Sequence, residues 1–470
     1  MSAFDRCCLG LRPTGFVVVA CLALALTGLL GRSAIAQAPK AAGPDEPAAD
    51  GPEKPKPDET AKPAAKAPAK PAAKAPAKPA AKVPAKPAAK VPAKPGAKAA
   101  PAEPYIEDKV DPKPAKRLDI LGLLRKGPVT ADEWAKIEKY YRDYALPRWT
   151  VIANRAEVSK WRVELATDVA VAKSPVRERL LLELLLPKLV DMVKKNYHPV
   201  ARVNAMLMIG RLNAEEPENL WSAEPPVPLP QAQAHLFAAL GDPQLPDAVK
   251  VAALVGIKRH AELGAVTTTE QKTAAADALL ALATTEAGPA GRSPAAHAWM
   301  RALAIDALGA LKDPGAGGKV SNALLGIAGQ AGAPFLLRCA AAGALGRLTY
   351  PEEPVIDPAV VIRQMAQLAR EVVGEELQRD SSGKGPLVHR RVQARLMTIH
   401  NALTEFTPAV TKTADVALQN SVLEALKSCL KTLEDEDIDD ATAAGKLSEQ
   451  LGSLSQTLAA PAAKKKPKEE

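Results

Sequence analysis

The nine residues 202–210, RVNAMLMIG, align without gaps with KVAALVGIK at 250–258, RALAIDALG at 301–309 and RCAAAGALG at 338–346. Each segment begins with a basic residue, carries alanine three positions later, and carries isoleucine or leucine seven positions later. Those two positions share one face of an α-helix, where the small residue lets a neighbouring helix approach and the branched residue fills the space beside it. Because one helix pair cannot bury such a face alone, the repeat predicts helix pairs stacked on one another.

The repeat is degenerate, since its basic residues are spaced by 48, 51 and 37 positions. They are Arg202, Lys250, Arg301 and Arg338. The pattern, with Asp242-Pro243 shortly before one such helix and Pro334 before another, resembles the HEAT-repeat family, in particular the short HEAT-like units related to those of phycobilisome lyases. The resemblance implies a right-handed α-solenoid, in which the basic residues bond to carbonyls or acids between adjacent repeats. A basic ladder for an anionic partner is the alternative for them.

Nearly all of residues 118–458 has a helical apolar period of 3.6, interrupted by proline, glycine and aspartate. We predict fourteen helices, the first over Thr130–Leu146 and the last over Ala441–Leu458, and no strand. The expected fold class is therefore all-α. Residues 174–409 are expected to form the HEAT-like repeats, with helical caps at 117–173 and 410–458; the segment at 391–394, RVQA, is the best candidate for a further repeat.

The first 36 residues are typical of a signal peptide. Arg6 and Arg12 precede an apolar run of roughly 16 residues, and Ala34-Ile35-Ala36 supplies an A-x-A cleavage site. This run is short for a bilayer span of about 20 residues, so cleavage is favoured over a retained anchor or a lipoprotein signal ending at Cys21. We expect an exported protein, periplasmic or extracellular, with no transmembrane segment after cleavage.

A low-complexity arm at 37–116 separates the leader from the predicted helices. Lysine recurs every fourth residue from Lys62 to Lys98, and proline occurs twice in every eight residues there. Proline blocks helix formation and nothing large and apolar is available for burial, so a disordered tether, partly polyproline II, is predicted. Residues 459–470 are expected to be a disordered basic tail.

The net charge of +9 belongs to these flanking segments. The arm at 37–116 holds sixteen lysines and ten acidic residues, whereas 117–458 holds 39 basic and 40 acidic residues. A nearly neutral body makes nucleic acid an unlikely partner.

No catalytic, cofactor-binding or metal-binding motif is found in the sequence. Its six histidines are isolated, and an enzyme is therefore not expected. The acidic run Glu434–Asp440 places aspartates like an EF-hand, but Asp440 and Lys446 replace the required glycine and glutamate, so an inter-helix loop is favoured over a calcium site. Cys339 and Cys429 lack motif partners and are predicted to be buried free thiols.

Two long loops contain the candidate partner contacts. Trp221 lies in the proline-rich loop 214–230, where folding back onto the helices is the alternative, and Lys384 lies in the loop 379–386. The leading hypothesis is an exported scaffold for an unidentified protein partner. The second is a polycation that binds an anionic envelope polymer or lipid through Lys62–Lys98, and a lyase-type enzyme is the third.

Overall fold

The computed structural model describes residues 103–217, 224–353, 355–381, 389–435 and 437–459. The expected signal peptide, the lysine-rich tract and the basic tail from residue 460 onward lie outside these ranges. The described residues are helical apart from their connections and one two-stranded ribbon, so the all-α class is confirmed.

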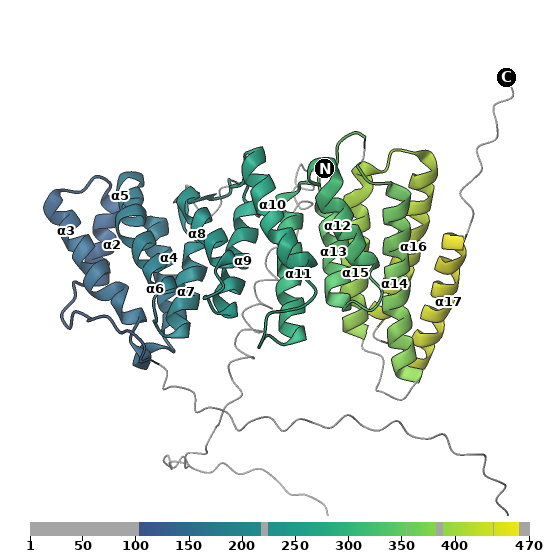
Figure 1. Ribbon diagram of the computed structural model, residues 1–470, viewed down its shortest axis with the longest axis horizontal. Helices are drawn as coiled ribbons and strands as arrows, with labels where there is room; N and C mark the ends of the chain where they lie inside the picture. The colour runs from purple at the N-terminus through teal and green to yellow at the C-terminus, as the bar shows by residue number, and fades with distance from the viewer. Residues whose placement is uncertain (1–102, 218–223, 354, 382–388, 436, 460–470) are drawn as a thin grey trace, which may run out of the picture. The chain divides into compact units, whose positions relative to one another are not determined.

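The helices follow one another along the chain with short connections (Figure 1). In chain order the elements are α2 (Arg117–Lys126), α3 (Ala131–Tyr140), η1 (Tyr141–Ala145), η2 (Pro147–Trp149), η3 (Ile152–Asn154), α4 (Val158–Val171), α5 (Ser174–Arg179), η4 (Leu180–Leu185), α6 (Leu186–Lys194), α7 (Pro199–Ile209), β1 (Asn213–Glu215), β2 (Val227–Pro228), α8 (Pro230–Gly241), α9 (Asp247–Glu262), α10 (Thr269–Thr284), α11 (Pro294–Leu311), η5 (Ala316–Gly318), α12 (Lys319–Gly329), α13 (Phe335–Arg347), α14 (Pro358–Ser381), α15 (His389–Phe406), η6 (Thr407–Ala409), α16 (Thr413–Glu434) and α17 (Asp440–Ala459).

Local sequence signals fix many of the helix starts. Thr130 and Thr268 each accept a hydrogen bond from the backbone three residues on, and the Glu or Gln at that position returns the bond, which completes capping boxes for α3 and α10. Proline is the first residue of α7, α8, α11 and α14, where its missing N–H costs nothing.

The leucine-rich stretch around Pro187 is one helical run of three parts, α5, η4 and α6. Pro187 has no N–H to donate to the preceding turn. The turn just before it widens into the π-helix η4, whose apolar side chains Leu180, Leu181, Leu184 and Leu185 are all buried.

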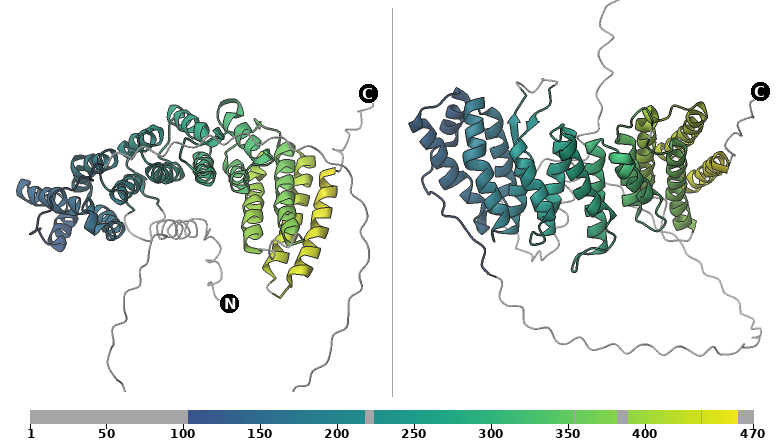
Figure 2. Two further views of the ribbon diagram at one scale, coloured as in Figure 1. Left: turned by 60° about the horizontal axis from the view of Figure 1, so that its bottom comes forward. Right: turned by 45° about the horizontal axis from the view of Figure 1, so that its top comes forward.

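Packing is mainly between helices close in sequence. The pairs α8–α9, α10–α11, α12–α13 and α14–α15 pack as hairpins, and the second helices α7, α9, α11, α13 and α15 also pack one against the next. Both views in Figure 2 show the same order from the blue N-terminal helices to the yellow α17. The buried apolar side chains form one cluster that extends from α2 to α17. At the C-terminal end α14 contacts α16 and α17 as well as α15.

Small residues let the second helices touch through their backbones. A Cβ placed on Gly210, directly after the end of α7, would lie 2.6 Å from Cα of Gly256 in α9. Likewise, a Cβ on Gly346 of α13 would lie 2.6 Å from Cα of Ala402 in α15. Gly210 and Gly346 occupy the same position of the sequence repeat, eight residues after the basic residue. The repeat therefore marks where successive second helices cross.

Three features differ from the predictions. Helix α2 was not predicted, because its apolar residues Ile120, Leu121 and Leu124 span little more than one turn and no side chain caps its start. The ribbon β1–β2 was not predicted either. Its strands have three and two residues, too few for an alternating pattern, and they pair through tertiary placement of the 214–230 loop.

The third difference concerns residues 103–116, which were expected to belong to the disordered arm. Here the backbone N–H of Ile106 donates to the carbonyl of Asn196 at 2.9 Å. The N–H of Asp108 donates to Oγ1 of Thr150 at 2.8 Å. These bonds hold the segment against the helices, so the expected boundary at residue 116 is wrong by about a dozen residues.

Candidate functional site

The basic repeat residues bond to the preceding helix. In three of the four repeat residues, the arginine Nε donates to a backbone carbonyl near the end of the preceding helix. The acceptor is the penultimate residue of α6, α10 or α12. These bonds join Arg202 to Val193 (3.0 Å), Arg301 to Ala283 (2.8 Å) and Arg338 to Ala328 (2.9 Å). The last carbonyls of a helix lack partners within it and attract positive charge, so each arginine clamps the two helices of a pair.

Two of these arginines are almost fully buried. Arg301 and Arg338 are only 6% and 3% exposed, so neither can present its charge to an anionic partner. Arg338 also forms an ion pair with Glu371 of α14 at 2.5 Å, which joins its pair to the next one. The described contacts of these two residues are therefore structural.

Lys250 differs from the three arginines. No hydrogen bond or ion pair joins its half-buried side chain to another described residue. The pKa of Asp247, at the start of α9, is lowered mainly by its hydrogen bonds with Arg292. The positive charge of Lys250 lowers it further.

Two further residues make the same kind of bond, although the sequence repeat does not mark them. Nε of Arg177 donates to the carbonyl of Val169 near the end of α4 at 3.3 Å. The amide of Gln419 in α16 donates to the carbonyl of Leu403 in α15 at 2.6 Å. Arg177 lacks the alanine three positions later, and Gln419 is uncharged. Both lie in the α-helix that directly follows the acceptor helix, as the repeat arginines do, so a search for a polar residue in that place would have found them.

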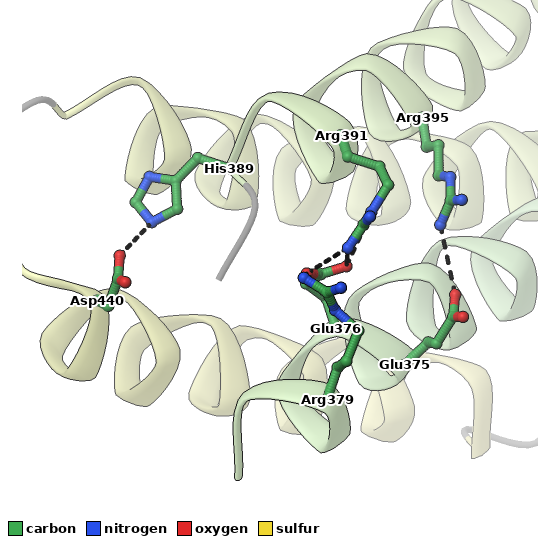
Figure 3. Close-up of polar contacts among 7 residues, drawn as sticks. All are labelled: Glu375, Glu376, Arg379, His389, Arg391, Arg395 and Asp440. Atoms are coloured by element: carbon green, nitrogen blue, oxygen red, sulfur yellow. Dashed lines mark hydrogen bonds and ion pairs between the residues drawn. The ribbon is translucent and has the colours of Figure 1, made fainter. Parts of the chain in front are cut away.

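The most extensive polar cluster lies between α14 and α15 (Figure 3). Arg391 occupies the basic position of the degenerate repeat at 391–394, but its partner is a side chain. Its Nη2 lies 2.7 and 2.6 Å from the two carboxylate oxygens of Glu376, and Nε of Arg379 reaches one of them at 3.1 Å. Glu376 is only 2% exposed. Its carboxylate thus takes the place that a helix carbonyl holds in the other pairs.

Two ion pairs flank this cluster in Figure 3. Nη1 of Arg395 lies 3.4 Å from Glu375, which again joins α15 to α14. Nε2 of His389 lies 3.3 Å from Asp440 at the start of α17. Donors from Arg379 and Arg391 occupy the Glu376 carboxylate. The cluster is suited to holding α14, α15 and α17 together.

The two candidate partner contacts, Trp221 and Lys384, both lie outside the described residues.

The acidic run at 434–440 contains a turn and a helix cap. Asp439 accepts from the N–H and the hydroxyl of Thr442, at 2.9 and 2.8 Å, and these hydrogen bonds lower its pKa. Oδ1 of Asp435 accepts from the N–H of Asp437 at 3.2 Å. Nowhere in the described part of the chain do three His, Cys, Asp or Glu side chains gather as metal ligands.

The two cysteines of the described chain are buried and unpaired, as the sequence predicts. Burial raises the pKa of both the Cys339 and the Cys429 thiol to about 11, so neither is a nucleophile at neutral pH.

Within its described ranges, the chain has no helix with the length and apolar character to cross a bilayer. Comparison with protein-family models, with curated proteins and with solved structures gives no match for this chain.

Proposed function

We propose that the protein is an exported scaffold that binds another protein on a right-handed α-solenoid of HEAT-like helix pairs. Serial packing of the second helices, from α7 through α9, α11 and α13 to α15, is the observation that carries this proposal. Arrays of stacked helix pairs extend by local contacts and present long surfaces, which suit extended partners. The leader at 1–36 would deliver the scaffold to the periplasm or the cell exterior, and the arm would tether it.

The clamps support a scaffold over a lyase-type enzyme. Three repeat arginines and Gln419 place their polar groups on backbone carbonyls of a neighbouring helix. The Glu376 cluster likewise joins helices. Side chains that bond in this way fix how the helices pack. The partner would then be recognised by other residues, on the surface of the helical array.

A second candidate function rests on the lysine that recurs at every fourth position from Lys62 to Lys98. Such a polycation would bind anionic envelope polymers or lipids and hold the helices near them. In that case the arm is the binding element and the helical part is its cargo.

Deleting residues 38–100 separates the two candidates and leaves the bonded segment 103–116 intact. The wild-type and deleted chains are incubated with envelope extracts, washed at about 0.15 M or about 1 M salt, where the Debye length falls from about 8 to about 3 Å, and only then cross-linked. A scaffold predicts a saturable protein partner that both chains retain at the lower salt concentration. Retention that disappears when the arm is deleted, and that salt abolishes in the wild type, would support the polycation instead. The absence of any saturable protein partner would refute the scaffold.

A further inference from the structure

Three arginines lie around α7. Arg162 belongs to α4, Arg211 follows the end of α7, and Arg259 belongs to α9. Helix α7 packs against both α4 and α9. We call these three residues the arginine cluster.

Arg162 uses only part of its hydrogen-bonding capacity within the described chain. Its Nε donates to Oδ1 of Asn204, a buried residue of α7, at 2.9 Å. Its Nη1 and Nη2 atoms have no hydrogen-bond partner among the described residues. Neither of these two atoms is buried. A half-buried guanidinium is therefore anchored at one nitrogen and offers its other two to solvent.

Arg259 is anchored at the other end of α7. Its Nη1 donates to the carbonyl of Gly210 at 3.2 Å, and its Nη2 donates to Oδ1 of Asn213 at 2.6 Å. The next residue after Gly210 is Arg211, which is exposed and whose side chain bonds to no described residue. The two cations thus lie beside each other where α7 ends.

The register of α7 connects the two ends of the cluster. Asn204 and Leu207 lie three residues apart on one face of α7. Arg211 follows Leu207 by four residues, just past the end of the helix, where Gly210 keeps helical dihedral angles and continues the path. Seven residues correspond to about 10 Å at 1.5 Å per residue. Leu207 is partly buried against the core and lies between the cationic ends. The face therefore has an apolar centre with positive charge on either side.

The three charges are incompletely compensated. Burial and the charge of Arg211 together lower the pKa of both Arg162 and Arg259. Glu216 and Glu262 act on Arg259 in the opposite sense, and Glu216 is bonded to Asn213 at 2.8 Å. Among the described residues, no carboxylate lies within ion-pair distance of any of the three guanidinium groups. Adjacent cations without a carboxylate favour an added anion.

From this geometry we infer that the arginine cluster binds an extended acidic segment of a partner protein, with one carboxylate at Arg162, a second at Arg211 and an apolar residue over Leu207. Side chains alternate between the two faces of an extended chain, so two acidic residues four positions apart, with an apolar residue midway between them, share one face. They span about 13 Å at about 3.3 Å per residue, and the flexible arginine and glutamate side chains take up the difference from about 10 Å. Guanidinium groups bind carboxylates through paired N–H donors, which the open Nη atoms of Arg162 supply. This assignment rests on the proposed scaffold function and names the chemistry of its partner.

The test uses a fluorescein-labelled peptide with two glutamates four residues apart and a leucine midway between them, and a matched peptide with glutamines. Anisotropy titrations at about 0.15 M salt compare the full chain with an R162Q/R211Q variant. The matched control is R125Q/K136Q, which removes the same charge from two exposed residues of α2 and α3 that have no ion pair in the described chain. The lysine-rich arm is identical in all three proteins, so its contribution cancels.

The glutamate peptide should bind the cluster variant about tenfold or more weakly, as the loss of a charge-assisted hydrogen bond predicts. The control should change its affinity by less than about twofold, and the glutamine peptide should bind all three weakly. Equal weakening by both variants, or no binding by the wild type, would overturn the assignment. So would displacement of the peptide by millimolar inorganic phosphate, which would indicate a site for small anions.

Folding of the variants is checked by their melting temperatures, and R211Q alone removes a side chain with no described partner. Failure of this assignment is distinguishable from failure of the scaffold. If the arm-deleted chain still captures a saturable partner and R162Q/R211Q captures it equally well, the scaffold stands and the cluster is not its contact.

Discussion

Replacing Gly346 with alanine tests whether the sequence repeat marks helix crossings. The new Cβ would lie 2.6 Å from Cα of Ala402, in the backbone of α15. Carbon atoms in contact prefer 3.5 to 4.0 Å, so α13 and α15 would have to separate by about 1 Å. Contacts between these helices, which lie at the centre of the C-terminal half, would all be weakened.

The matched control is Gly374→Ala in α14, because a Cβ there meets nothing within 4 Å. Alanine in a helix interior gains about 0.5–1 kcal/mol over glycine. Overpacking a tight site costs about 1–3 kcal/mol. We therefore expect Gly346→Ala to be destabilised by about 1–2 kcal/mol after this gain, and Gly374→Ala to be stabilised by up to about 1 kcal/mol.

Urea unfolding followed by circular dichroism gives the midpoints, and amide exchange shows where the loss occurs. Arrays with local contacts can unfold in parts, so faster exchange confined to α13 and α15 is the more specific signature. The reasoning is refuted if Gly346→Ala unfolds at or above the wild-type midpoint, or if both glycine variants move in the same direction.

Three further predictions concern buried polar groups. His260 is fully buried in α9, and burial, with the charge of Arg259, lowers its pKa to about 4. Its neutral form is favoured in the fold, so the protein should lose about 3 kcal/mol as pH falls from about 6.5 towards 4, and a His260→Leu variant should lack this loss in acid-dependent melting. Arg301→Met keeps an aliphatic stem but removes the clamp on α10, and should cost about 1–3 kcal/mol in urea unfolding, whereas Lys250→Met should change stability by about 0.5 kcal/mol or less. Cys339 and Cys429 should resist a thiol reagent in the native protein and react only as it unfolds; rapid labelling at neutral pH would contradict their burial.

Much of the helical part follows from periodicity alone. The second helices are predictable because one face carries alanine and leucine at fixed spacing, and the same repeat locates the clamps at Arg202, Arg301 and Arg338. The basic residue bonds to the preceding helix, the small residue lets a neighbouring helix approach, and the branched residue fills the space beside it. Their spacing is therefore constrained by geometry as well as by composition.

Features that depend on distant parts of the chain were not predictable in the same way. Residues 103–116 lack apolar periodicity, and their order comes from single bonds such as Ile106 to Asn196. The pairing of Arg391 with Glu376 replaces a backbone acceptor with a side chain that no sequence pattern identifies. The arginine cluster likewise joins residues about fifty positions apart, whose proximity appears only when α4, α7 and α9 are packed.

The bonded segment 103–116 also determines how the molecule would respond to a mechanical load. Tension arriving along the chain at residue 103 would act first on the hydrogen bonds that Asn196 forms with the carbonyls of Glu103 and Pro104 and with the N–H of Ile106. It would act next on residue 108, whose carboxylate pairs with Lys188 at 2.7 Å. Those partners belong to α6 and the turn after it. While the Asn196 bonds hold, the force would therefore enter beyond α2, α3 and α4, and these helices would be shielded. Once those bonds failed, the load would also reach Thr150, between α3 and α4, through its bond to Asp108.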